Sequence, residues 1–119
     1  MKILVTGSDG FIGRNMIGWL SAEGWEVTGW EWDEIARPDV RGYDWVVHLG
    51  AIADMSETDV DRVLIQNLEF SQWLFAECQR NGVNLQYASS SSVYGEGLPV
   101  PFRENMSLPA PKSLYAVSK

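Results

Sequence analysis

Short apolar runs alternate along the chain with longer segments whose apolar residues recur at helical spacing. The runs have the length and β-rich composition of buried strands, and they lie at residues 2–6, 26–30, 44–50 and 83–89. Residues 11–23 and about 57–81 have the spacing of helices, and Gly24 and Gly82 follow them as stop signals. Strands that alternate with helices pair in parallel through right-handed crossovers. The pattern therefore predicts an α/β domain that covers residues 1–119.

The helix expected over residues 57–81 carries apolar side chains on more than one side. Ser56 is its expected N-cap. Its expected core stripe is centred on Leu64, Leu68, Ser71 and Phe75. The same stripe carries Val60, Val63, Asn67, Leu74 and Cys78. Ile65 and Trp73 project away from that stripe, which indicates a partner surface. The strand at 83–89 would also be an unpaired sheet edge, which proteins normally cover. Both features predict a homodimer or larger assembly; the alternative is that Trp73 packs on its own domain.

Composition narrows the possible classes of function. The net charge is −7 with only nine Lys and Arg residues, which argues against a nucleic-acid partner. Cys78 is the only cysteine, so an internal disulfide is excluded and a reducing compartment is favoured. No apolar run approaches the length of a membrane span, and the apolar residues Ile3 to Val5 are too few for a signal-peptide core. We therefore expect a soluble, cytoplasmic protein with no membrane partner.

A glycine-rich turn, GSDGFIG at residues 7–13, joins the first strand to the first helix. Gly7 permits a tight turn, Gly10 lets a pyrophosphate approach the backbone, and Gly13 lets helix and strand pack closely. The helix N-terminus adds free N–H groups and a positive dipole end. A dinucleotide site also needs an acid about 20 residues further on for the ribose hydroxyls. Glu31 is the candidate and Asp33 the alternative; because such an acid repels a 2′-phosphate, NAD is favoured over NADP.

Together with this turn, the segments DWVVHLGA, YASSSSVYG and YAVSK resemble the extended short-chain dehydrogenase/reductases. These are NAD-dependent nucleotide-sugar epimerases and dehydratases, and the likeness is greatest to the ADP-heptose 6-epimerase branch. The resemblance implies a Rossmann-type fold and a catalytic set of Ser, Tyr and Lys. Tyr115 and Lys119 match the Y-x-x-x-K motif. Counting four residues back from the tyrosine of V-Y-G gives Ser90, with Ser91 as the alternative.

This set of residues suits the oxidation of an alcohol. A hydride can leave the alcohol carbon only if the hydroxyl also loses a proton. A neighbouring ammonium stabilises a phenolate that can accept this proton. A spacing of four residues places Tyr115 and Lys119 on one face of a helix. Ser90 follows a strand, where its hydroxyl can orient the substrate oxygen.

The resemblance also implies further cofactor-binding residues. They are Phe11 and Ile12 in the glycine turn, Asp39 and Val40 near the adenine, Gly50 and Ala51 after a strand, and Asn67, which braces the loops around the cofactor. Phe70 replaces a glycine of the family pattern. His48 is the only histidine, so we expect a structural role for it and no metal site.

Family members continue well beyond the lysine of this motif. The resemblance therefore implies that residues 1–119 form the cofactor-binding half, with the lobe that holds the nucleotide-sugar absent and without turnover by themselves. The alternative is a self-contained, catalytically silent dinucleotide-binding or assembly module.

Overall fold

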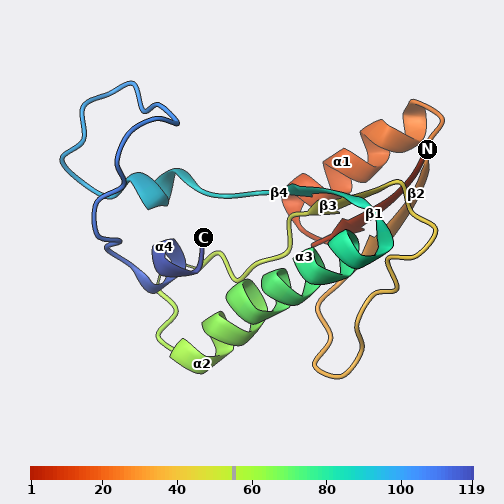
Figure 1. The fold of residues 1–119 in the computed structure, drawn as a ribbon, viewed down its shortest axis with the longest axis horizontal. Helices are drawn as coiled ribbons and strands as arrows, with labels where there is room; N and C mark the ends of the chain where they lie inside the picture. Colours follow the sequence, from red (N-terminus) through yellow and green to blue (C-terminus); the bar gives the residue numbers. More distant parts are fainter. Residues whose placement is uncertain (55) are drawn as a thin grey trace.

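The computed structural model describes residues 1–54 and 56–119 and contains one parallel sheet with helices on both sides (Figure 1). Its four strands lie in the order β2-β1-β3-β4 and all pair in parallel. The strands are β1 (Lys2–Thr6), β2 (Glu26–Trp30), β3 (Trp45–His48) and β4 (Asn84–Tyr87). The helices are α1 (Phe11–Ala22), α2 (Val60–Val63), the π-helix η1 (Leu64–Glu69), α3 (Phe70–Asn81), the 3₁₀-helix η2 (Ser91–Tyr94) and α4 (Leu114–Ser118). The α/β prediction is confirmed.

Alternation along the central strands divides the core into two layers. Leu4 and Val46 pack with Leu74 on the side of α3. On the opposite face, Val5 and Val47 pack with Leu20 of α1, as side chains one residue apart in a strand must. Figure 1 shows α1 and α3 on either side of the sheet.

The N-cap of the long helical segment lies three residues later than expected. Asp59 is the N-cap, and its carboxylate accepts a hydrogen bond from the Arg62 N–H. Ser56 was the expected cap, but its hydroxyl donates to Asp54 instead. α2, η1 and α3 follow one another without a break, and Gly82 ends the segment with φ = 67°, a conformation that glycine adopts without strain.

The stripe of this segment that faces the sheet agrees with the expected one in part. The buried positions are Val63, Asn67, Phe70, Ser71, Leu74 and Cys78. Leu68 and Phe75, expected in the core, are exposed to 36% and 40%. Two adjacent apolar stripes run along this helix, and tertiary contacts decide between them. Phe70, for example, stacks on Trp30 with ring centroids 5.0 Å apart.

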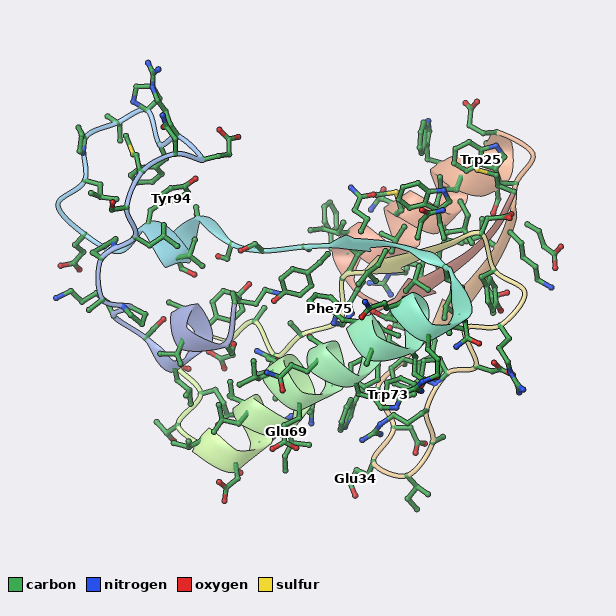
Figure 2. All side chains as sticks on the ribbon, in the orientation of Figure 1. Trp25, Glu34, Glu69, Trp73, Phe75 and Tyr94 are labelled. Atoms are coloured by element: carbon green, nitrogen blue, oxygen red, sulfur yellow. The ribbon has the colours of Figure 1, made fainter. Side chains whose placement is uncertain are left out.

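Trp73 packs against its own domain, so its expected place on a partner surface is wrong. Its ring stacks on Phe70 at a centroid distance of 5.7 Å, and the side chain is partly buried against the core. Figure 2 shows Trp73 on the side of α3 toward the loop that carries Glu34, with Phe75 on the other side of the helix. Ile65 is 42% exposed, as expected.

Irregular segments complete the fold. The link between β2 and β3 contains no helix among its described residues, and another irregular segment separates η2 from α4. Within the described part of the chain, no helix combines the length and apolar character that crossing a bilayer requires.

Three backbone segments converge at the carboxyl end of β1, because the residues at the points of contact are glycines and have no side chains. A Cβ on Gly13 would lie 2.0 Å from the Gly7 carbonyl oxygen, and one on Gly7 would lie 2.7 Å from the Gly50 nitrogen. Gly7 also has φ = 72°, which non-glycine residues rarely adopt. The start of α1, the turn after β1 and the end of β3 therefore approach to backbone contact.

This convergence predicts opposite effects for the same substitution at two glycines of α1. Gly13→Ala should lower the free energy of unfolding by about 2–4 kcal/mol, because backbone must move to admit the methyl group. Gly18→Ala should be neutral or raise it by up to about 1 kcal/mol, since alanine is the better helix former. No described atom beyond the neighbouring helix backbone lies within 4 Å of a Cβ at Gly18. Urea unfolding followed by circular dichroism measures both, and equal effects would contradict the close approach.

Candidate functional site

A cleft of about 500 Å³ opens where the four strands end at their carboxyl termini. Segments that directly follow each strand contribute to it, and α4 closes one side. Its lining consists of Gly7, Gly10, Phe11, Ile12, Gly13, Trp30, Glu31, Trp32, Leu49, Gly50, Ala51, Ala53, Gln66, Phe70, Ala88, Ser89, Tyr115 and Lys119. Ligands of open α/β sheets bind at this end of the strands.

The glycine turn forms the wall at the start of α1. Gly10 is the N-cap residue and has no side chain to occupy the space before the helix. Phe11 and Ile12 are exposed to 81% and 60%, and both line the cleft. This wall presents helix N–H groups between two apolar side chains, an arrangement suited to an anionic group that carries apolar or aromatic parts.

Glu31 lies against the glycine turn rather than free at the end of β2. One carboxylate oxygen accepts from the Asp9 N–H and, at 3.3 Å, from the Ser8 hydroxyl. This carboxylate therefore closes the turn and also lines the cleft. The alternative acid, Asp33, accepts from the N–H groups of Ile35 and Ala36, and these backbone hydrogen bonds lower the pKa of its carboxyl.

Asp39 and Val40 do not line the cleft. Asp39 pairs with Arg41 at 2.7 Å on the surface, and that partner lowers the pKa of the carboxyl to about 2. Val40 is buried in the core layer beneath α3. The short link between β2 and β3 places both residues there.

Aromatic side chains line this part of the cleft, and sequence reasoning missed them. They are Trp30 and Trp32, which flank Glu31, and Phe70 of α3. Phe70 stacks on Trp30 and meets Trp32 edge-on at 5.4 Å. The sequence did contain a signal for them: Phe70 replaces a glycine of the family pattern, and two tryptophans lie at the end of a strand.

α4 places Tyr115 and Lys119 on the opposite wall. Ser113 caps this five-residue helix by accepting from the Ala116 N–H. Lys119 Nζ lies 4.4 Å from the centre of the Tyr87 ring, a cation–π contact. Burial lowers the pKa of the Lys119 ammonium and raises the pKa of the Tyr87 phenol. Tyr87 was not among the expected site residues.

The serine cluster meets the cleft through Ser89. Ser90, the expected catalytic serine, is the N-cap of η2 and accepts hydrogen bonds from the N–H and hydroxyl of Ser92. Ser91, the alternative, begins η2 and is exposed. Ser90 therefore lies one residue beyond the residues that line the cleft, with its hydroxyl oxygen already used as an acceptor.

Asn67 joins two segments that border the cleft. Its side chain accepts from the Ile52 N–H at 2.7 Å and donates to the Ile52 carbonyl at 3.0 Å. The same amide nitrogen donates to the Ser118 hydroxyl of α4 at 3.0 Å. Asn67 is 1% exposed and lies outside the lining, so it supports the loop after Gly50 and Ala51 rather than the cleft surface itself.

His48 ends β3 beneath the cleft and is 1% exposed. Both ring nitrogens have partners: Nδ1 lies 2.6 Å from the Thr6 hydroxyl and Nε2 lies 2.8 Å from the Ser71 hydroxyl. Burial, with a smaller contribution from the nearby Lys119 charge, lowers the pKa of His48 from 6.5 to about 4. The imidazole is therefore neutral at physiological pH.

Comparison with known proteins gives one family. The NAD dependent epimerase/dehydratase family matches residues 3–119. The ADP-L-glycero-D-manno-heptose-6-epimerase of Cupriavidus pinatubonensis is 33% identical over 146 aligned positions, which cover 100% of this chain and 43% of that protein.

Solved structures agree in fold. A short-chain dehydrogenase/reductase superfamily protein from Agrobacterium tumefaciens, with bound NAD, gives a TM-score of 0.85 at 30% identity over 100% of this chain and 42% of its own. MoeE5 in complex with UDP-glucose and NAD gives 0.86 at 31% identity over 99% of this chain and 45% of its own. The chain thus spans less than half the length of these relatives.

The buried neutral His48 predicts a pH-dependent stability. Between about pH 6.5 and 4 the unfolded chain binds a proton at this residue that the folded chain does not, so stability falls as the pH falls. The full loss is roughly 3 kcal/mol across this window, with little further loss from this residue below it. His48 is the only histidine, so few other side chains titrate in the upper part of this window, above about pH 5, whereas the 16 Asp and Glu residues titrate in its lower part. Urea unfolding at several pH values should show the slope in wild type and not in His48→Gln; equal slopes would contradict the assignment.

Proposed function

The chain belongs to the NAD dependent epimerase/dehydratase family, and we propose that it is the cofactor-binding half of a nucleotide-sugar epimerase. One observation carries the proposal. The glycine turn and Glu31 form one wall of a single cleft, and Tyr115 and Lys119 form the opposite wall. Residues separated by about a hundred positions along the chain are thus brought to one site at the carboxyl ends of the strands.

The geometry of the turn suits a dinucleotide. Gly7 and Gly13 have no room for a Cβ, so the start of α1 lies directly behind the turn. The free N–H groups there would hold the pyrophosphate, as helix N-termini do. Glu31 lines the same cleft and would accept from ribose hydroxyls, and its charge would oppose a 2′-phosphate. Trp30 and Trp32 provide flat apolar surface in the same cleft, suited to an aromatic base.

Tyr115, Lys119 and Ser90 would handle the proton of the sugar hydroxyl. Bound NAD supplies a reversible hydride acceptor. Tyr115 would take the hydroxyl proton, and the Lys119 ammonium would stabilise the resulting phenolate. The cation–π contact with Tyr87 orients that ammonium within the cleft. Ser90 would orient the substrate oxygen by donating its hydroxyl proton, since its oxygen already accepts from Ser92.

The relatives support a nucleotide-sugar as the substrate. One relative is an ADP-heptose epimerase and another was solved with UDP-glucose and NAD. Epimerisation at a sugar carbon needs only a transient oxidation, so the cofactor returns to its starting state. We propose this reaction for the whole protein, with NAD preferred over NADP.

A homodimer is the proposed assembly, and the structure changes the surface expected to form it. Ile65 and Leu68 are exposed by 42% and 36% on the outer side of η1. Trp73 is excluded from that surface because it packs on Phe70. A second copy of this helical segment would cover Ile65 and Leu68, as is common in the family that the sequence resembles.

The cofactor proposal predicts NADH binding that one glycine controls. NADH should quench tryptophan fluorescence on binding, because Trp30 and Trp32 line the cleft. Gly10→Leu should weaken binding by at least about tenfold, equivalent to about 1.4 kcal/mol, because the side chain fills the space in front of α1. Gly10 has φ = −69° and ψ = 166°, so leucine is compatible with its backbone.

Gly18→Leu is the matched control, since it adds the same side chain to the same helix away from the cleft and should leave NADH affinity unchanged. A folded wild-type chain that binds neither NADH nor NADPH would refute the proposal. A strong preference for NADPH would contradict only the role of Glu31.

The revised surface predicts different outcomes for two substitutions to glutamate. Leu68→Glu should shift the chain toward monomer in light scattering at tens of micromolar, with unfolding unchanged, because the side chain is already exposed. Trp73→Glu should instead lower the free energy of unfolding by about 2–4 kcal/mol, since it removes an aromatic contact from the domain. A monomeric wild type at this concentration would count against the homodimer.

A further inference from the structure

Five buried polar residues form a chain of hydrogen bonds from the sheet to α4, in which one link runs through the backbone carbonyl of Asn67. They are Thr6, His48, Asn67, Ser71 and Ser118, and none is more than 6% exposed. The Thr6 hydroxyl meets His48 Nδ1 at 2.6 Å, and His48 Nε2 meets the Ser71 hydroxyl at 2.8 Å. The Ser71 hydroxyl donates to the backbone carbonyl of Asn67 at 2.5 Å. The side-chain amide of Asn67 donates to the Ser118 hydroxyl.

The hydrogen bond from Ser71 to the backbone carbonyl of Asn67 determines where the protons lie in the rest of the chain. A carbonyl oxygen can only accept, so Ser71 spends its single proton on Asn67 and must accept from His48 Nε2–H. Burial keeps the ring neutral, so a ring protonated on Nε2 leaves Nδ1 as an acceptor, and Nδ1 takes the Thr6 hydroxyl proton. The Thr6 oxygen in turn accepts from the Gly50 N–H at 3.3 Å. The imidazole is therefore neutral and protonated on Nε2.

The Ser71 hydroxyl bond falls at the junction of η1 and α3. In a π-helical turn the regular i→i−4 pattern is interrupted, and such turns are rare and often mark functional sites. The Ser71 hydroxyl supplies a donor to the carbonyl of Asn67 within η1. This bond fixes the backbone of Asn67, whose side chain then holds the Ile52 backbone and Ser118.

Ser118 connects Asn67 to the helix that carries Tyr115. Its hydroxyl donates to the Tyr115 carbonyl at 2.8 Å, so it accepts from the Asn67 amide. Ser118 also directly precedes Lys119, whose ammonium lies over Tyr87, while the His48 and Tyr87 rings lie 5.6 Å apart. α4 has only five residues and needs such contacts, because a helix this short is marginal by itself.

We propose that His48 is a positioning residue: its Nε2–H, through Ser71, holds the π-helical turn so that Asn67 fixes α4, and with it Tyr115 and Lys119. This proposal rests on the proposed function only for the roles of Tyr115 and Lys119. The hydrogen-bond geometry that carries it is independent of any cofactor.

The first test is spectroscopic. With ¹⁵N-labelled histidine, the single histidine gives one set of ring signals, and long-range ¹H–¹⁵N correlations distinguish the two neutral tautomers. The expected result at neutral pH is a neutral ring protonated on Nε2. A ring protonated on Nδ1, or an imidazolium, would overturn the proposal, because Ser71 could not then bond as the geometry requires.

The second test compares two amides at position 48. His48→Gln can place its NH₂ group near the position of Nε2 and keep the bond to Ser71, whereas His48→Asn is too short and keeps only the Thr6 side. The readout is the rate at which an acylating reagent labels each lysine, measured by mass spectrometry. Lys2 and Lys112 are the only other lysines, so they serve as internal controls.

We expect His48→Asn to label Lys119 roughly tenfold faster than wild type, the change in local opening that loss of one buried hydrogen bond gives. His48→Gln should stay close to wild type, and Lys2 and Lys112 should be unchanged in both variants. Equal labelling of Lys119 in the two variants, or no change in His48→Asn, would overturn the proposal.

Serine variants carry the same test if His48→Asn does not fold. Ser71→Ala should accelerate Lys119 labelling and change the His48 signals, while Ser118→Ala should accelerate labelling and leave the Nε2 tautomer intact. Unchanged labelling in Ser71→Ala would overturn the proposal. Failure of wild type to bind NADH would refute the proposed function and leave these results standing.

Discussion

The close approach of three backbone segments at Gly7, Gly13 and Gly50 is the constraint on which the site depends. A Cβ at Gly13 would lie 2.0 Å from the Gly7 carbonyl oxygen, so α1 can begin directly behind the turn only if that side chain is missing. The same absence at Gly7 lets the end of β3 lie beside the turn. One wall of the cleft is thus made of backbone, and backbone N–H groups are what an anionic ligand needs at a helix start.

The opposite wall has a different origin, because α4 is too short to hold its own position. Ser113 caps it, Asn67 bonds Ser118, and Lys119 lies over Tyr87 of β4. Each of these contacts either closes the helix locally or ties it to the sheet and to the η1 turn. The contact with Ser118 connects this helix to the buried polar chain that runs through Asn67, Ser71 and His48 to Thr6. Contacts with neighbouring elements, rather than the helix itself, therefore determine where Tyr115 and Lys119 lie.

Features with local causes could be predicted from the sequence. The first strand, the glycine turn and the first helix follow from neighbouring residues, as do the stops at Gly24 and Gly82. The exact centre of the stripe of α2–α3 that faces the sheet could not be predicted, because two adjacent stripes are apolar and Leu68 and Phe75 of the expected one are exposed. Phe70 meets Trp30 and Asn67 meets Ile52 only after the chain has folded.

The candidate site shows the same division between local and distant causes. The glycine turn and the two ends of the Y-x-x-x-K motif lie in the cleft where their motifs would place them. Asp39 and Val40 do not, because the short link from β2 to β3 ties one to Arg41 and buries the other. The contributions of Trp30, Trp32 and Tyr87 depend on the contacts between strands and helices, which no local motif records.

Charge adds a last requirement for the proposed ligand. The chain carries a net charge of −7, so its overall field opposes a dinucleotide, which is itself an anion. Attraction must then come from groups at the cleft. The start of α1 offers N–H groups at the positive end of its dipole, and Lys119 brings an ammonium to the opposite wall. Glu31 lines the cleft beside the turn, and its carboxylate accepts from the Asp9 N–H and the Ser8 hydroxyl, which partly compensates its charge. Attraction of the dinucleotide to these nearby donors, which salt screens least, thus outweighs its repulsion by the more distant acidic surface, which salt screens.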